Sequence, residues 1–203
     1  MPDWERLRVL ERLKSSTAVQ HRRLEALVDI MNPSRSLADY AALLCDFQAF
    51  YAPLEAQIFG HADWAALDLD IAARRKGALL ERDLNSLGMV ASEPYPDSFL
   101  RSSFPASLGA MYVTEGATLG GQVIGRHLQA TLGLTPANGC AFFCSYGERV
   151  GPMWLEFRDF LSAQATDAAI VQTVVDGAVE TFERFGDWLE SQQIERNRSE
   201  RSR

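Results

Sequence analysis

Metal chemistry in this chain has few possible ligands, because the sequence contains only three histidines, His21, His61 and His127. A carboxylate-bridged di-iron bundle needs Glu-x-x-His pairs on two helices, and no such pair occurs. The three cysteines form no CxxC motif, so reduced thiols are expected rather than a metal bound through sulfur. One histidine bound to a heme iron is the simplest arrangement that remains.

His21 has two neighbours at helical spacing that suit a ligand role. Lys14 precedes it by seven residues and would lie on the same helix face, about 10 Å along the axis, close to the lateral distance between a heme iron and a propionate. Glu25 follows by four residues, where its carboxylate can accept the imidazole N–H and leave the other ring nitrogen for iron. An ordinary histidine beside a helix ion pair has the same pattern, so spacing alone leaves both interpretations open.

A second candidate feature is a run of glycines inside one apolar segment. Each costs about 1 kcal/mol relative to alanine in a helix interior, so the run needs a physical reason. Either another helix packs very close, or a flat ligand lies against bare backbone, and the spacing suits both. The glycines are Gly109, Gly116, Gly120, Gly121 and Gly125.

Helical periodicity dominates the chain, without sustained two-residue alternation between hairpin turns. The first predicted helix ends at Asn32–Pro33, and the second opens with Ser36 and Asp39 as a capping box. The third ends at Gly88, and Thr166–Asp167 caps the last one. The predicted helices cover about 4–31, 36–59, 71–87, 106–131, 153–163 and 168–193.

These elements predict an all-α fold, a single-domain irregular helical bundle. No repeat or linker divides the chain, so residues 1–194 are expected to form one domain. Residues 89–104, with Pro94 and Pro96, are predicted to form a loop. Residues 195–203 contain no apolar side chain and are predicted to be a disordered, basic tail.

Composition excludes several classes of protein. The chain is 47% hydrophobic and 23% charged, as globular proteins are, and its net charge of −7 makes nucleic acid a poor partner. No apolar run approaches the ~20 residues of a membrane helix, and residues 1–14 lack an apolar signal core. We therefore expect a cytoplasmic protein that does not bind membranes.

Together these features resemble the heme oxygenase family over nearly the whole chain. Residues 13–25 are similar to its proximal helix, and Tyr112–Val123 (YVTEGATLGGQV) is similar to its kinked distal helix. That distal segment is the most specific part of the resemblance. Gly139–Phe143 and an aromatic last helix follow in the expected order. The sequence of Gly120–Leu128 is closest to bacterial members encoded with bacteriophytochromes.

The resemblance implies a heme sandwiched between a proximal helix and a kinked, glycine-rich distal helix. His21 would be the neutral iron ligand, with Glu25 as its hydrogen-bond partner. Backbone at Gly116, Gly120 and Gly121 would lie against the distal face of the heme, leaving room for dioxygen and little else.

The resemblance also implies the remaining contacts with the cofactor. Lys14 and Arg158 would pair with the propionates. Tyr112, in the distal motif, and Phe182, in the aromatic last helix, would complete the cofactor-binding set.

In this family heme b is both cofactor and substrate. The implied activity uses dioxygen and external electrons to convert heme to biliverdin, carbon monoxide and ferrous iron. No flavin or nicotinamide motif is present, so a ferredoxin, a flavodoxin or a reductase would supply the electrons. The product would serve a bacteriophytochrome as chromophore, or the reaction would release iron.

The chain departs from the mammalian-type pattern at two positions. Those members have an aspartate at the position of Ala117, which anchors a distal water network, and Thr118 is the candidate replacement. They also have a tyrosine at the position of Met111. Tyr112 lies about 100° round the helix and cannot be assumed to substitute. Efficient turnover is therefore a weaker expectation than heme binding.

The rival hypothesis is a non-catalytic heme carrier or sensor. His127 lies on the predicted distal helix and would block oxygen if it were a second axial ligand. An unrelated helical binding protein is the other alternative. Formation of a bilin from hemin, a reductant and oxygen separates the three.

Overall fold

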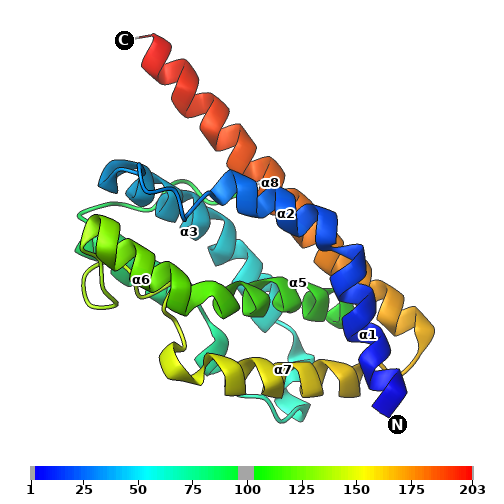
Figure 1. Cartoon of the computed structure of the whole chain (residues 1–203). Coiled ribbons are helices and arrows are strands. Elements are labelled where there is room, and N and C mark those ends of the chain that lie inside the picture. The colour runs from blue at the N-terminus through cyan, green and yellow to red at the C-terminus, as the bar shows by residue number, and fades with distance from the viewer. Residues whose placement is uncertain (1–2, 96–102, 203) are drawn as a thin grey trace.

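The computed structural model describes residues 3–95 and 103–202, so residues 96–102 of the predicted loop, with Pro96, lie outside the described residues. The described residues form helices and no β-strand, which confirms the predicted all-α bundle (Figure 1). None of their helices is long and apolar enough to cross a membrane. The α-helices are α1 (Asp3–Ser16), α2 (Ala18–Val28), α3 (Leu37–Phe59), α4 (Gly77–Ser86), α5 (Phe104–Gly116), α6 (Gly121–Leu132), α7 (Val150–Gln164) and α8 (Ala168–Arg201), and the 3₁₀ turns are η1 (Ala62–Ala66), η2 (Ala72–Arg74), η3 (Ala117–Gly120) and η4 (Gly147–Arg149).

Helix α5 runs through the middle of the bundle and packs most extensively on α8, while α1 and α2 lie along the outer side of α8 (Figure 1). The α5–α8 crossing is very close. A Cβ on Gly109 would lie 2.0 Å from the Val174 carbonyl oxygen, and one on Gly177 would lie 2.3 Å from the Ala106 carbonyl oxygen. For Gly109 the helix-packing explanation is therefore correct.

The first predicted helix is two helices in the structure. Thr17 separates α1 from α2, and its buried hydroxyl donates to the Leu13 carbonyl oxygen at 2.7 Å. Such back-bonding bends helices, which the apolar periodicity does not reveal. Helix α2 also ends before Asn32–Pro33, at Val28, because Asp29 adopts the left-handed conformation with φ 40°.

The glycine-rich helix is kinked as the resemblance implies. Helix α5 ends at Gly116, η3 (Ala117–Gly120) tightens the backbone, and α6 starts at Gly121. Glycine in the helix interior lowers the cost of leaving α geometry, so the change occurs where side chains are smallest.

Four other helix boundaries test the sequence-based predictions. The capping box of Ser36 and Asp39 is present, and Asp167 caps α8. The predicted helix 71–87 is instead a 3₁₀ turn, η2, followed by α4. Gly88 follows α4 with φ 67°, as a left-handed helix stop.

The predicted disordered tail differs most from the structure. Helix α8 continues to Arg201, and the guanidinium of Arg196 donates to both carboxylate oxygens of Asp46, at 3.0 and 2.8 Å. Glutamate and arginine are good helix formers, so a segment without apolar residues can extend a helix that is already nucleated.

Candidate functional site

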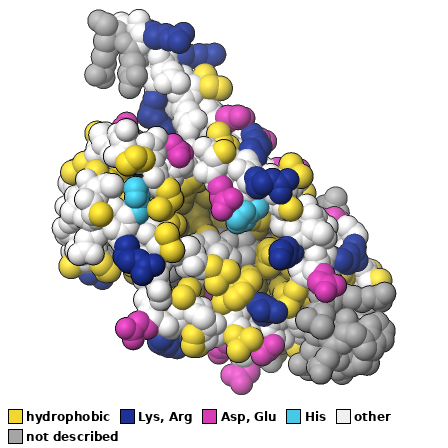
Figure 2. Space-filling view, in the orientation of Figure 1, with side chains coloured by type: hydrophobic (Ala, Val, Ile, Leu, Met, Phe, Trp, Pro, Cys, Tyr) yellow, Lys and Arg dark blue, Asp and Glu magenta, His cyan; other side chains and the backbone are white. Residues whose placement is uncertain are grey.

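A cavity of about 700 Å³ lies between α2 and the α5–η3–α6 segment. Figure 2 shows it as a hollow lined largely by hydrophobic side chains, with lysine and arginine side chains on the surface around it. Helices α3, α7 and α8 and the segment 142–145 close its inner end. Its lining includes Thr17, His21, Leu24, Glu25, Val28, Phe47, Tyr51, Lys76, Tyr112, Gly116, Ala117, Thr118, Gly120, Val123, Ile124, Phe142, Phe143, Trp154, Phe182 and Phe185.

His21 provides the one imidazole in the lining. Its Nδ1 lies 3.3 Å from Glu25 Oε2, and its ring makes an edge contact with Phe182 at 5.7 Å between centroids. A proton on Nδ1 would face the Glu25 carboxylate and would leave Nε2 available to a metal. The structure thus brings His21, Glu25 and Phe182 together in the lining of the cavity.

The other two histidines lie elsewhere. His61 precedes η1 and its Nε2 is 2.8 Å from the Ser107 hydroxyl, while its ring packs on Phe104. His127, on α6, is absent from the lining of the cavity. A second axial ligand from His127 therefore finds no support in this geometry.

The glycines of the distal segment divide into two groups. Gly116 and Gly120 line the cavity, and a Cβ on either would meet only side-chain atoms, Trp154 at 3.9 Å and Ile124 at 3.2 Å. Gly121 is absent from the lining. It is buried, and a Cβ there would lie 2.3 Å from the Phe143 carbonyl oxygen. The geometry thus places two of the three predicted glycines against the cavity and assigns the third to packing.

Two threonines of the same segment line the cavity with their hydroxyl protons already engaged. Thr118 donates to the Glu115 carbonyl oxygen at 2.7 Å, and Thr114 donates to the Met111 carbonyl oxygen at 3.2 Å. Each hydroxyl can still accept a hydrogen bond. Ala117 contributes only a methyl group, and Met111 is buried in the core.

The two residues predicted to pair with the propionates lie outside the lining of the cavity. Lys14 is exposed on α1, and neither it nor Arg158 lines the cavity. Arg158 does lie near Tyr112, which is a lining residue packed on Trp154. Burial raises the pKa of Tyr112, and the charge of Arg158 opposes that rise. Arg158 is therefore close enough to interact electrostatically with Tyr112, although only Tyr112 lines the cavity.

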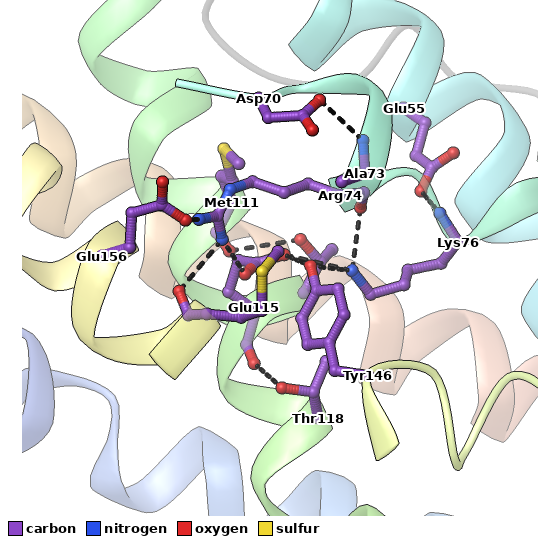
Figure 3. Close-up of polar contacts among 12 residues, drawn as sticks. Glu55, Asp70, Ala73, Arg74, Lys76, Met111, Glu115, Thr118, Tyr146 and Glu156 are labelled. Carbon is purple, nitrogen blue, oxygen red and sulfur yellow. Dashed lines mark hydrogen bonds and ion pairs between the residues drawn. The ribbon is translucent and has the colours of Figure 1, made fainter. Parts of the chain in front are cut away.

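A buried ionic cluster at the inner end of the cavity has no counterpart among the predicted residues (Figure 3). Arg74 pairs with Glu115 at 2.5 Å and with Glu156 at 2.6 Å, and Lys76 pairs with Glu115 at 3.1 Å. The Tyr146 hydroxyl accepts from Lys76 and donates to Glu115, each at 2.6 Å. The sequence offers one signal for this cluster, because Glu115 is a carboxylate inside an apolar helix and needs a buried partner.

Asp83 holds the backbone segment that carries Phe142 and Phe143, two aromatic residues of the cavity lining. Its buried carboxylate accepts hydrogen bonds from the backbone N–H groups of Ala141 and Phe142, at 2.7 and 2.8 Å. These bonds hold the segment that presents Phe142 and Phe143 to the cavity. In the sequence this segment was only part of the family resemblance, and the structure places two of its residues, Phe142 and Phe143, in the lining.

The fold and the cavity define a helical protein that can enclose an apolar ligand between one histidine and bare backbone. Comparison with known proteins agrees. The heme oxygenase family model matches residues 7–191. Heme oxygenase PigA of Pseudomonas aeruginosa is 27% identical over 183 residues, which cover 89% of this chain and 90% of PigA. The NO- and CO-bound heme oxygenase of Neisseria meningitidis has the same fold, with a TM-score of 0.77, 23% identity and 91% of each chain covered. The chain belongs to the heme oxygenase family, and it is an enzyme that degrades heme.

Proposed function

We propose that the cavity binds heme b with His21 Nε2 as the iron ligand, and that the enzyme uses dioxygen and external electrons to form biliverdin, carbon monoxide and ferrous iron. One observation carries the proposal: His21 is the one histidine in the lining, and Gly116 and Gly120 line the opposite wall. The volume of about 700 Å³ is within the range of cofactor sites. When bound, the heme supplies the iron at which dioxygen reacts.

The chain's own residues would orient the heme and exclude water. Glu25, 3.3 Å from His21 Nδ1, would accept a hydrogen bond from Nδ1–H and so favour the tautomer with Nε2 unprotonated. On the opposite wall, Gly116 and Gly120 have no side chains and would leave space for a small ligand beside the heme. The aromatic side chains of the lining, among them Phe47 and Phe143, would cover the apolar part of the macrocycle.

The propionates would lie near Tyr112, with Arg158 and Lys14 reaching them from outside the lining of the cavity. A phenol and two cations suit two carboxylates, because charge-assisted hydrogen bonds are about twice as strong as neutral ones. Changing Lys14 to Glu should weaken hemin affinity or rotate the heme and change the biliverdin isomer ratio. If both stay unchanged, Lys14 has no part in propionate binding.

The electron donor would be a ferredoxin, a flavodoxin or a reductase. Delivery of the bilin to a bacteriophytochrome, release of iron and a cytoplasmic location stay predictions. Hemin mixed with the protein, oxygen and either ascorbate or a ferredoxin system should give a biliverdin spectrum. A carrier or sensor would keep the heme spectrum under the same conditions.

The decisive variant is His21→Ala. It should abolish turnover and the axial-ligand absorption signature, keep part of the apolar heme association, and regain iron ligation with added imidazole. His61→Ala and His127→Ala are the matched controls and should leave the signature unchanged. Loss of the signature in either control, with His21→Ala unaffected, would falsify the assignment.

A further inference from the structure

Among the described residues, Lys76 is the one lysine or arginine that lines the cavity, and its side chain is almost completely buried. Its Nζ donates to Glu115 Oε1 at 3.1 Å, to the Tyr146 hydroxyl at 2.6 Å and to the Arg74 carbonyl oxygen at 2.8 Å. An ammonium group has three N–H donors, so each of them has a protein acceptor. Figure 3 shows these bonds meeting at the end of the Lys76 side chain. The charge is therefore held in one position.

The cluster around Lys76 contains two cations and three carboxylates. Arg74 and Lys76 both pair with Glu115, and Arg74 also pairs with Glu156, which is half exposed on α7. The Glu55 carboxylate accepts a hydrogen bond from the backbone N–H of Lys76. Of these five residues, only Lys76 belongs to the lining of the cavity, and fixed charges act strongly where water is excluded.

No side chain of the α5–η3–α6 segment that lines the cavity carries a positive charge. The hydroxyl protons of Thr114 and Thr118 are directed to carbonyl oxygens of their own helix, and Ala117 has no polar atom. These hydroxyls can accept a hydrogen bond but not stabilise an anion. Lys76 is the remaining group with the required sign.

We propose that Lys76 makes the inner end of the heme cavity electropositive. It would thereby favour small anionic ligands over neutral ones on the side lined by Gly116 and Gly120. This inference rests on the proposed heme site. Lys76 keeps its three protons on protein acceptors and acts through its electric field.

The test compares a charged probe with a neutral one on the hemin complex. Azide binding to the ferric complex reports anion stabilisation, and carbon monoxide binding to the ferrous complex reports steric access. In Lys76→Met, azide should bind on the order of tenfold more weakly, as expected for loss of one nearby charge in a site of low effective dielectric. Carbon monoxide affinity should stay within about twofold, and its C–O stretch should move to higher frequency as the positive field is lost.

Two further variants of the segment serve as controls. Arg75→Met removes a neighbouring exposed cation, which stacks on Phe59, and should change neither probe. Lys76→Arg keeps the charge and should retain most of the azide affinity. If Lys76→Met does not fold, Lys76→Gln removes the same charge and keeps a donor for Glu115.

The results separate this inference from the heme-site proposal. Absence of the His21-dependent ligand signature in the wild-type hemin complex would refute the heme site itself. With that signature intact, unchanged azide affinity and an unchanged C–O stretch in a folded Lys76→Met or Lys76→Gln protein would overturn the role of Lys76. Equal weakening of azide and carbon monoxide would also overturn it, because damage to the cavity affects both probes alike.

Discussion

The two walls of the cavity are built in different ways. The wall with the proposed iron ligand is α2, a helix with no buried residue, held on α8 by surface ion pairs of Arg23 with Asp187 and Glu190. The opposite wall is α5 and η3, where most of α5 is buried and Gly109 fits against α8 without room for a Cβ.

The two walls therefore differ in how far each can move when a ligand binds. The distal backbone is fixed by core packing, so its shape is set before a ligand arrives. Helix α2 has few buried apolar contacts and should open locally at lower free energy, so its amides should exchange faster than those of α5. We therefore expect the wall with the proposed iron ligand to adjust when a ligand binds, and the wall with Gly116 and Gly120 to stay fixed.

The largest expected effect comes from filling the α5–α8 crossing. Gly109→Ala would put a Cβ 2.0 Å from the Val174 carbonyl oxygen and 2.7 Å from the Ala178 nitrogen, both backbone atoms that cannot move away. We expect a loss of at least about 3 kcal/mol, or failure to fold. Urea unfolding of the heme-free protein measures it.

Gly116→Ala is the control on the same helix, because its Cβ would make only an ordinary contact with Trp154 at 3.9 Å. Its stability should be unchanged or slightly higher. Equal destabilisation by Gly109→Ala and Gly116→Ala would contradict the division of the glycines into packing and cavity positions.

The next effect separates two adjacent glycines. Gly121→Ala should cost about 1–3 kcal/mol, since its Cβ would lie 2.3 Å from the Phe143 carbonyl oxygen. Gly120→Ala should be neutral or stabilising, because its nearest neighbour, 3.2 Å away, is the flexible end of Ile124. Turnover per bound heme should show the reverse order, with Gly120→Ala slower and Gly121→Ala close to normal.

A larger side chain sharpens this test. Gly120→Leu should fold and bind heme but fail to make biliverdin, since its side chain would occupy space on the distal side of the cavity. A destabilised Gly120→Ala protein with normal turnover per bound heme would instead support the packing explanation at this position too.

A smaller effect concerns the far end of α8, which supports α2 through a hydrogen bond from Gln193 to the Leu27 carbonyl oxygen at 3.1 Å. Burial raises the pKa of the Asp46 carboxyl, and Arg196 opposes that rise. Arg196→Met would leave a buried, unpaired carboxylate and should cost about 1–3 kcal/mol at pH 7. Arg198→Met, at an exposed position on the same helix, is the control and should cost almost nothing.

The pH dependence of that cost has a definite sign. Without Arg196, the folded-state pKa of Asp46 rises further above the unfolded value, so stability is lost as pH rises through the folded pKa. The difference in the free energy of unfolding between wild type and Arg196→Met should therefore be smaller at pH 4 than at pH 7, as measured by urea unfolding. A gap that is equal at both pH values would mean that Asp46 is not the group left unpaired.

Sequence patterns predicted the features that depend on local spacing. His21 and Glu25 are one helical turn apart, and the kink of the glycine-rich helix was expected from the family resemblance. Features that depend on distant partners were not predictable. Lys76 and Glu115 meet only through the tertiary fold, and Gly121 was assigned to the cavity because a sequence does not show which face of a kinked helix meets a neighbouring backbone.

The smallest expected effect concerns the ion pairs that hold α2. Arg23 lies 2.8 Å from Asp187 and 2.7 Å from Glu190, and all three side chains are at least one-third exposed. Exposed pairs contribute about 0–1 kcal/mol and are screened by salt. Arg23→Ala should therefore lower the stability of the heme-free protein by less than about 1 kcal/mol in low salt, and by less still in 1 M NaCl. Arg22→Ala, at an exposed neighbouring position, is the control. A loss as large as that of Gly121→Ala, or one that persists in 1 M NaCl, would mean that α2 is anchored as firmly as the distal wall.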